Sequence, residues 1–426
     1  MRILIENVDL LQEDKILFDK YILIENDRIA TISDKKDFED VDYRIDGKNK
    51  LAMPGLVNTH THLAMTLFRG FADDLPLKEW LENKIWPQEA KLTAEDVYWG
   101  SLLGLCEMIR SGTCAFADMY FYMDEVAKAV VKSGIRASLS VGMIPTLGRE
   151  ESTLKGGLDF AKNWHKAENG RILAMLAPHA PYTCSPSFLE KVVDKAVEYN
   201  LRIHTHLSET ASEVKDIKDA YGLTPIRLMN KIGLFNVPVL AAHCVCVDDE
   251  EIEILAEKGV GVAHNPQSNL KLASGIAPIG KMLKKGVKVG LGTDGPASNN
   301  NLDMWEELRL AAILHKGIEL DPIVVPANTA LNLATKNGME ILGWNDSGII
   351  KEGYKADLIL IDINKHHFFP RHNLISHLVY SASGSDVDTV IVDGKILMEK
   401  RELKTLDEEK IMYEAERRAF DLVKKT

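Results

Sequence analysis

The chain has 426 residues, 46% apolar and 27% charged, with a formal net charge of −12. That length and composition are typical of a globular protein with one large domain and a smaller one. The negative charge argues against general binding to nucleic acids or to anionic membranes, since both favour basic surfaces.

The first fifty residues predict a small β-element. Short strand-like runs occupy Ile3–Ile5, Lys20–Glu25, Arg28–Ile32 and Tyr43–Asp46, with turn-forming residues between them. Acidic Glu6 interrupts this start too early for a signal-peptide core.

From Pro54 onward, apolar strand-like runs alternate with amphipathic helical stretches. Eight runs are predicted as strands: Leu56–His62, Thr113–Tyr120, Arg136–Gly142, Ile172–His179, Arg202–Glu209, Val239–Cys244, Val260–Pro266 and Val287–Asp294. Helix-like segments lie between them: Ala94–Arg110, Met123–Ser133, Ser187–Asn200, Asp248–Lys258 and Ala277–Lys285. Buried strands separated by helices predict an α/β fold, a (β/α)8 TIM-like barrel. The alternative is a doubly wound open sheet, which the lack of a Gly-x-Gly-x-x-Gly or Gly-x-x-x-x-Gly-Lys-Ser/Thr loop disfavours.

Strand-like runs return after a helical stretch at Ala327–Leu342. They occupy Asp357–Ile363, Thr389–Val392 and Lys395–Met398, and a charged helix at Asp407–Lys424 follows, with a solvated face. Because β-rich ends flank the barrel, we expect them to pair. The predicted organisation is a small β-sandwich domain from residues 1–53 and 346–426, the latter with the C-terminal helix, beside a barrel of residues 54–345.

No apolar run is long enough to cross a bilayer, and the five cysteines form no Cys-x-x-Cys pair. We therefore expect a cytoplasmic protein without a disulfide framework or a zinc ribbon.

Seven of the thirteen histidines fall at the ends of predicted strands, where barrel enzymes place their active sites. They are His60, His62, His179, His204, His206, His243 and His264, and Asp294 ends the eighth strand. Any one of them alone is better explained as a buried, hydrogen-bonded ring. A cluster repeated on strand after strand is not, because burying so many polar rings without ligands is costly.

A metal centre explains this cluster. His60 and His62 alternate on one strand and so project from the same face, within reach of one ion. With a later histidine and Asp294 they supply the three or four ligands of a catalytic zinc-type site, whose bound water has a pKa of about 7. Glu209 follows His206 by three residues, where it can move protons to a leaving group.

Taken together, these segments resemble the amidohydrolase superfamily. The resemblance rests on Pro54-Gly-Leu-Val-Asn-Thr-His60-Thr-His62, His206-Leu-Ser-Glu209, Ala-Ala-His243, His264-Asn-Pro-Gln-Ser-Asn269, Gly292-Thr-Asp294-Gly and Gly353-Tyr-Lys-Ala-Asp357. The most similar branch is the deaminases of S-adenosylhomocysteine, 5′-methylthioadenosine and 5′-deoxyadenosine. It covers nearly the whole chain and implies a barrel with a β-sandwich made from both termini.

The resemblance implies hydrolytic deamination of an adenine ring with one divalent metal ion, zinc. The implied metal ligands are His60, His62, His206 and Asp294. The implied catalytic residues are Glu209 as the proton shuttle to the ring nitrogen, His243 as the residue that orients the water, and Asp294 as the proton acceptor. Binuclear relatives carry a carbamylated lysine on the fourth strand, and the lack of lysine there favours a single ion. His204 and His264 fall outside the implied ligand set and are interpreted as structural.

For the substrate, the resemblance implies contacts from Glu89, His179, Glu209 and Asp294. Glu89 matches the family's glutamate that holds the ribose hydroxyls, which suits two acceptor oxygens and a vicinal diol. Trp80 would pack against the far side of the nucleoside, or else only against a neighbouring helix. Arg149 would contact the ribose side of the substrate or a tail that carries a carboxylate, or else lie on the surface. Where some relatives have an arginine, the third strand ends Ser-Val-Gly142, so we expect a weaker grip on the homocysteine carboxylate.

Two other functions remain open from the sequence. One is a different amidohydrolase, such as a guanine or cytosine deaminase or a chlorotriazine-type hydrolase; the other is a non-catalytic scaffold barrel. The expected partners are a small nucleoside and further copies of the chain in a homo-oligomer, with no nucleic acid and no membrane.

Overall fold

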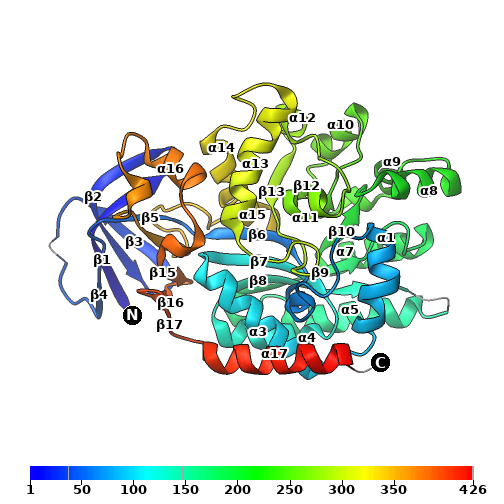
Figure 1. Ribbon diagram of the computed structural model, residues 1–426, viewed down its shortest axis with the longest axis horizontal. Coiled ribbons are helices and arrows are strands. Elements are labelled where there is room, and N and C mark those ends of the chain that lie inside the picture. Colours follow the sequence, from blue (N-terminus) through cyan, green and yellow to red (C-terminus); the bar gives the residue numbers. More distant parts are fainter. Residues whose placement is uncertain (37, 146–147, 425–426) are drawn as a thin grey trace.

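The computed structural model describes residues 1–36, 38–145 and 148–424, which form a barrel beside a separate sheet (Figure 1). The barrel strands follow each other in chain order and all neighbours are parallel. They are β6 (Leu56–Thr61), β7 (Thr113–Tyr120), β8 (Arg136–Met143), β9 (Ile172–Pro178), β10 (Arg202–Leu207), β11 (Val239–His243), β12 (Gly261–His264) and β13 (Lys288–Leu291). The predicted barrel is confirmed, and each strand lies within two residues of its predicted limits, apart from the end of β13.

The last and first strands of the barrel are joined by side-chain hydrogen bonds and by one backbone bond, from the Asp294 N–H to the His60 carbonyl (2.9 Å). The Asn58 amide donates to Thr293 Oγ1 (2.7 Å), and its carbonyl accepts the Thr293 N–H (3.1 Å). Thr59 Oγ1 donates to the Leu291 carbonyl (2.8 Å). Since these groups are fully buried, each bond satisfies a polar atom that has no access to water.

Helices cover the outside of the barrel. They are α3 (Ala94–Arg110), α4 (Met123–Ser133), α5 (Glu150–Trp164), α6 (Ala167–Gly170), α7 (Pro186–Tyr199), α8 (Ala211–Tyr221), α9 (Pro225–Lys231), α10 (Asp249–Glu257), α11 (Pro266–Lys271), α12 (Ile279–Lys284), α13 (Met304–Glu319), α14 (Ala327–Leu333) and α15 (Lys336–Leu342). The prediction of one continuous helix at Ala327–Leu342 is wrong in one respect: the non-helical backbone of Thr335 divides this stretch into α14 and α15.

Short helices occupy several loops. They are η1 (Leu63–Phe68), α1 (Leu77–Trp80), η2 (Leu81–Ile85), α2 (Trp86–Glu89), η3 (Leu234–Asn236), η4 (His366–Phe368), α16 (Leu374–Tyr380) and η5 (Gly384–Asp386). The first four after β6 form the connection that precedes α3.

Both ends of the chain build the second sheet, in the order β17-β16-β15-β14-β5-β1-β2-β3, with β4 beside β1. The strands are β1 (Arg2–Gln12), β2 (Lys15–Glu25), β3 (Arg28–Ser33), β4 (Tyr43–Asp46), β5 (Lys50–Pro54), β14 (Leu358–Asp362), β15 (Val387–Val392), β16 (Lys395–Glu399) and β17 (Glu402–Leu403). β1 is much longer than the predicted Ile3–Ile5, because it continues past an irregularity near Asn7, which has a positive φ of 53°. β5 and β14 pair directly, so the two termini share one sheet as expected.

A buried ion pair joins the sheet to the barrel. Arg136, at the start of β8, is 1% exposed and contacts Asp357 with two guanidinium nitrogens (3.0 and 3.1 Å). Arg136 Nη2 also donates to Asp393 in the β15–β16 turn (2.9 Å). Asp357 further accepts bonds from Ser347 Oγ (2.6 Å) and the Asp393 N–H (2.8 Å), so both of its oxygens accept two hydrogen bonds.

The C-terminal helix α17 (Glu408–Lys424) lies along α3 (Figure 1). Its buried residues are Ile411, Ala415, Arg418 and Leu422, and Arg418 bonds to buried Asp96 of α3 (2.9 Å). All five cysteines are free, and no helix of the described residues is long and apolar enough to span a membrane.

Replacing Arg136 with methionine is expected to lower the free energy of unfolding by about 3–5 kcal/mol, because Asp357 would remain buried without a cation. Chemical denaturation measures the change. The control is Lys155→Met, which breaks an exposed pair with Asp159 on α5 and should change stability by less than about 0.5 kcal/mol. Equal losses in the two variants would contradict the structural role of Arg136.

Candidate metal centre and active site

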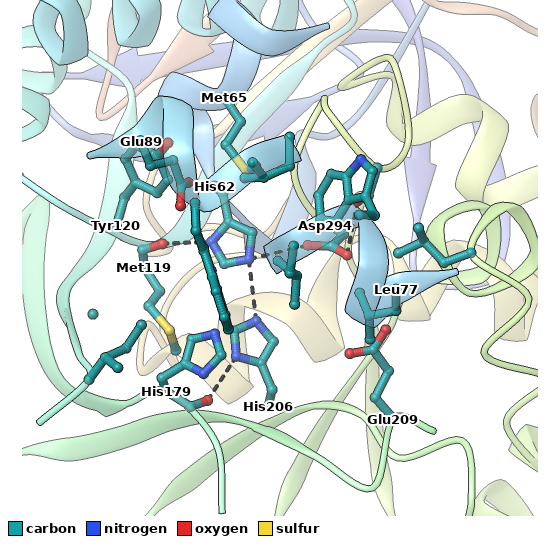
Figure 2. A pocket seen from close by; sticks show the side chains of 18 of the residues that line it. His62, Met65, Leu77, Glu89, Met119, Tyr120, His179, His206, Glu209 and Asp294 are labelled. Carbon is teal, nitrogen blue, oxygen red and sulfur yellow. Dashed lines mark hydrogen bonds and ion pairs between the residues drawn. The ribbon is translucent and has the colours of Figure 1, made fainter. Parts of the chain in front are cut away.

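A pocket with about 690 Å³ of empty space, part of it open to solvent, lies at the carboxyl ends of the barrel strands (Figure 2). Its floor is polar and contains His62, His206, His243, Glu209 and Asp294. Its walls are largely apolar and aromatic. This is the position at which barrel enzymes bind their substrates.

Three histidine rings converge at the floor of the cavity. The Nε2 atoms of His62 and His206 lie 3.3 Å apart, and Asp294 Oδ1 lies 3.3 Å from His62 Nε2 and 3.4 Å from His60 Nε2. His60 Nε2 is buried and has no hydrogen-bond partner. Ring nitrogens and a carboxylate oxygen gathered at one point, one of the nitrogens without a hydrogen bond, are an arrangement that a cation satisfies.

Outer partners fix the orientation of each ring. His62 Nδ1 donates to the Met119 carbonyl (2.6 Å), and His206 Nδ1 donates to the His179 carbonyl (2.8 Å). His60 Nδ1 bonds to His204 Nε2 (2.8 Å). The carbonyl partners place a proton on Nδ1 of His62 and of His206. In the neutral rings this leaves the Nε2 lone pair for a metal, which is the tautomer that a metal requires.

Asp294 is held as a carboxylate. Ser268 Oγ (2.6 Å) and Ser298 Oγ (3.1 Å) donate to Oδ2, and the Gly295 N–H donates to Oδ1 (2.7 Å). Burial acts to raise the pKa of Asp294, but the nearby His60 and His62 rings bring it well below its usual range. The carboxylate therefore carries its negative charge beside the histidine nitrogens.

The donor set fits one divalent metal ion. Ligand atoms of His60, His62 and His206 lie within 4.8 Å of one another, and so do those of His60, His243 and Asp294. Burial lowers the pKa of His60 to about 4, so this ring is neutral and available as a ligand at pH 7. Nitrogen and carboxylate ligands in this number match a catalytic zinc site with an open position.

Glu209 and His243 lie beside this cluster. His243 Nδ1 donates to Asn269 Oδ1 (2.9 Å), and its Nε2 is 3.7 Å from Glu209 Oε2. Ser274 Oγ donates to Glu209 Oε1 (3.0 Å). Burial raises the pKa of Glu209 above the usual value of a glutamate carboxyl group, which favours its protonated form.

Two glycines allow the eighth strand to approach the first. A Cβ at Gly292 would lie 2.9 Å from the His60 backbone nitrogen, and a Cβ at Gly295 would lie 2.7 Å from Met65 Sδ. Asp294 between them has a positive φ of 60°, a conformation that is unfavourable for most residues and is common at functional sites. The sequence Gly-Thr-Asp-Gly thus places the carboxylate against the histidines.

One wall is formed by α1, η2 and α2, which follow one another without a break and together make a continuous helical segment of thirteen residues, 77–89. It contains a π-helical turn, in which the Trp86 N–H bonds to the Leu81 carbonyl. Pro87 has no N–H and disfavours the α-helical pattern at this point, which the wider turn accommodates. The pocket residues before the turn are Leu77, Trp80 and Leu81, and those after it are Ile85, Trp86 and Glu89.

The π-turn determines which side chains face the cavity. In an uninterrupted α-helix, Leu77 and Trp86 would lie about 180° apart, because nine residues advance the helix by two and a half turns. The extra residue in the turn rotates Trp86 and Glu89 back by about 100°. Both halves of the helix therefore contribute to one wall.

The other predicted substrate contacts differ in position. Glu89 lies beside Tyr120 in the cavity. Burial raises the pKa of Glu89, although the hydrogen bond with the Tyr120 hydroxyl acts to lower it. His179 lines the cavity, and its Nδ1 bonds to Thr183 (3.0 Å). Trp80 lines the cavity and is also 5% exposed within the core, with its Nε1–H donated to the Ala72 carbonyl (2.9 Å). Arg149 is exposed just before α5 and is not among the described residues that line the cavity.

Several supporting residues have no individual signal in the sequence. Ser268 and Ser298, which bond to Asp294, and Asn58, which closes the barrel, belong to this group. Asn58 and Ser268 lie inside the segments that carry the family resemblance. His264 pairs with His315 of α13 (3.2 Å), and His204 supports His60.

The chain is similar to known proteins over nearly its whole length. The amidohydrolase family model matches residues 51–397. A protein of Dictyoglomus turgidum, named 5-methylthioadenosine/S-adenosylhomocysteine deaminase, is 78% identical over 425 residues, which is 100% of both chains. A protein of Carboxydothermus hydrogenoformans with the same name is 55% identical over 99% of both chains.

Solved structures are similar over the whole fold. An adenosine deaminase from Xanthomonas campestris with bound zinc has a TM-score of 0.95 and 35% identity, with 99% of this chain and 98% of that one covered. A zinc complex of atrazine chlorohydrolase from Arthrobacter aurescens has a TM-score of 0.92 and 27% identity, with 98% and 100% covered. The family model covers most of the chain, and a relative with that family's activity in its name is 78% identical over the full length. The chain therefore belongs to the amidohydrolase family.

Proposed function

We propose that this protein is a zinc-dependent deaminase that hydrolyses the adenine ring of 5′-substituted adenosines to the inosine analogue and ammonia. The observation that carries the proposal is the convergence of His60, His62, His206 and Asp294 below an apolar cavity that also contains Glu89. The names of the two relatives above support the same substrate class.

His60, His62, His206 and Asp294 are the residues that would hold the metal. When bound, the ion supplies a water molecule of lowered pKa, about 7, as the nucleophile. The Nδ1 partners of the three rings keep their lone pairs directed at this position.

The protons of the water are moved by Asp294 and Glu209. Hydrolysis forms a bond between the water oxygen and the amine-bearing ring carbon and breaks the bond from that carbon to the amino nitrogen. Of the two water protons, one ends on the neighbouring ring nitrogen and the other leaves in ammonia. Asp294 accepts the first proton, and Glu209 delivers a proton to the ring nitrogen.

His243 stabilises charge that develops on the oxygen. Its Nδ1–H bond to Asn269 leaves Nε2 facing the site, where the ring orients the water. A polar ring held in this position stabilises the negative charge as it develops.

The walls of the cavity favour a compact 5′-substituent. None of the described lining residues is Arg or Lys, and burial lowers the pKa of His179 to about 3, so this ring is neutral. The carboxylate of a homocysteine tail would find no cation there, whereas a methyl or methylthio group meets Leu77, Leu81 and Ile144.

Ammonia release from a substrate panel tests the function. Zinc-loaded protein is expected to deaminate 5′-methylthioadenosine and 5′-deoxyadenosine with kcat/KM at least equal to that for S-adenosylhomocysteine. Free adenine, guanine, cytosine and a chlorotriazine serve as comparison substrates. Faster turnover of a free base or of the triazine would assign a different activity, and a strong preference for S-adenosylhomocysteine would contradict the interpretation of the walls.

Glu89→Ala is expected to lower kcat/KM for 5′-methylthioadenosine roughly 10- to 100-fold, which is the size of a lost charged hydrogen bond. The loss should disappear for the 2′,3′-dideoxy analogue, because that compound has no diol for Glu89 to bind. Glu82→Ala, on the exposed side of the same helix, is the matched control and should leave both values unchanged. An equal loss for both compounds would exclude the diol contact.

Metal analysis is expected to find about one zinc ion per chain. Chelation should abolish ammonia release and lower the thermal midpoint, since a ligand at 100 times its Kd stabilises the native state by about 2.7 kcal/mol. Added zinc should restore both. His62→Ala should lose the zinc, whereas Glu209→Gln should keep it, and full activity of the metal-free protein would contradict the proposal.

A further inference from the structure

Glu213 is a buried carboxylate that the chemistry above does not use. We propose that it is the positioning residue for Glu209, because its two oxygens bond to the backbone that carries Glu209. The catalytic part of this inference rests on the proposed function, in which Glu209 transfers the proton. The structural part, that Glu213 holds this backbone, stands independently.

The contacts of Glu213 are directed back to the end of β10. Its Oε1 accepts the Ser208 N–H (2.9 Å), and its Oε2 accepts the Glu209 N–H (2.7 Å). The residue lies in the first turn of α8 and is 5% exposed. The Glu213 N–H donates to Thr210 Oγ1 (3.1 Å). This bond caps the helix and fixes the position of the Glu213 backbone, from which the side chain extends.

The backbone that Glu213 holds has an unfavourable conformation. Ser208 has a positive φ of 52°, and no glycine is present to make this inexpensive. The turn sends the chain from β10 into α8 within three residues. Such a conformation persists only where surrounding bonds determine it.

The carbonyls of the same segment are held from the other side. The Cys244 N–H donates to the Leu207 carbonyl (3.0 Å), and the Cys246 N–H donates to the Ser208 carbonyl (2.9 Å). Glu213 supplies the acceptors for the Ser208 and Glu209 N–H groups. The buried N–H and carbonyl groups of this segment are thus hydrogen-bonded on both of its sides. The end of β11 and the start of α8 thus clamp the turn between them.

The clamp directs the Glu209 side chain into the cavity. Figure 2 shows its carboxyl group at the edge of the site, across from His206 and below Leu77. There it reaches Ser274 and the His243 ring. A shift of about 1 Å in such a group is enough to lower a rate by two orders of magnitude.

The chemistry of the clamp requires a carboxylate. Two adjacent N–H groups need two acceptors, and glutamine offers one acceptor and one NH₂ group that would face a donor. Glu213→Gln has nearly the same shape, so it alters the hydrogen bonds with little change in packing.

The matched control is Glu251→Gln in the next strand–helix unit. Glu251 is also buried in the first turn of its helix, α10, and accepts the N–H of Asp248 (2.9 Å), but it contacts Thr224 and Arg227 and not the Glu209 segment. Any loss of stability from removing such a carboxylate appears in this variant too.

Kinetics with 5′-methylthioadenosine test the catalytic part. Glu213→Gln is expected to lower kcat roughly 10- to 100-fold, with KM changed less than about twofold and zinc content unchanged. Glu251→Gln should keep kcat within about twofold. Glu213→Gln combined with Glu209→Gln should be no slower than Glu209→Gln alone, since the clamp acts through Glu209. Additive losses, or an equal loss of kcat in Glu251→Gln, would overturn the positioning role.

Amide hydrogen exchange tests the clamp without any assay of activity. Glu213→Gln is expected to speed exchange of the Ser208 and Glu209 amides at least tenfold, and Glu251→Gln is expected to leave them unchanged. Unchanged protection in Glu213→Gln would overturn the proposal. If the wild-type protein releases no ammonia from any nucleoside, the proposed function fails, while exchange still decides whether Glu213 holds the turn.

Discussion

The close approach of the eighth strand to the first is the constraint on which the site depends. Asp294 must reach the histidines of β6, and it does so because Gly292 and Gly295 leave no side chain between the two segments. The Asn58 and Thr59 side chains then tie the segments together. The same bonds close the barrel and fix the distance between a carboxylate and two imidazoles, so fold and candidate metal site share one set of interactions.

That shared set explains why so many polar groups are buried at one end of the barrel. Each ring has one nitrogen bonded to a neighbour outside the cluster and one directed at the centre. In surroundings of low dielectric constant, a buried nitrogen without a hydrogen bond, such as His60 Nε2, is costly, and a cation between the rings is correspondingly favourable. The buried Arg136–Asp357 pair at the other end of β8 shows the contrasting solution, in which both charges are satisfied within the protein.

The sequence predicts the barrel and the strand-end histidines well because the signals are local. Alternation along a strand determines that His60 and His62 share a face, and parallel strands bring their carboxyl ends to one edge. The loops depend on packing over long range. Arg149 is exposed although it follows a strand, and Thr335 interrupts a continuous helical pattern. Ser268 and Glu213 have ordinary polar side chains whose importance arises only from what lies opposite them.

The walls of the cavity follow a different rule from its floor. Strand ends hold the floor, whereas one helical segment in a loop supplies much of the wall. The π-turn just before Pro87 decides that Trp86 and Glu89 face inward. Adding or deleting one residue in that helical segment would rotate half of the wall by about 100° and leave every floor residue in place. Changes in this helix can therefore alter the substrate while the floor keeps its chemistry. Relatives with the same fold, such as the adenosine deaminase and the atrazine chlorohydrolase, are named for different substrates, as such a division permits.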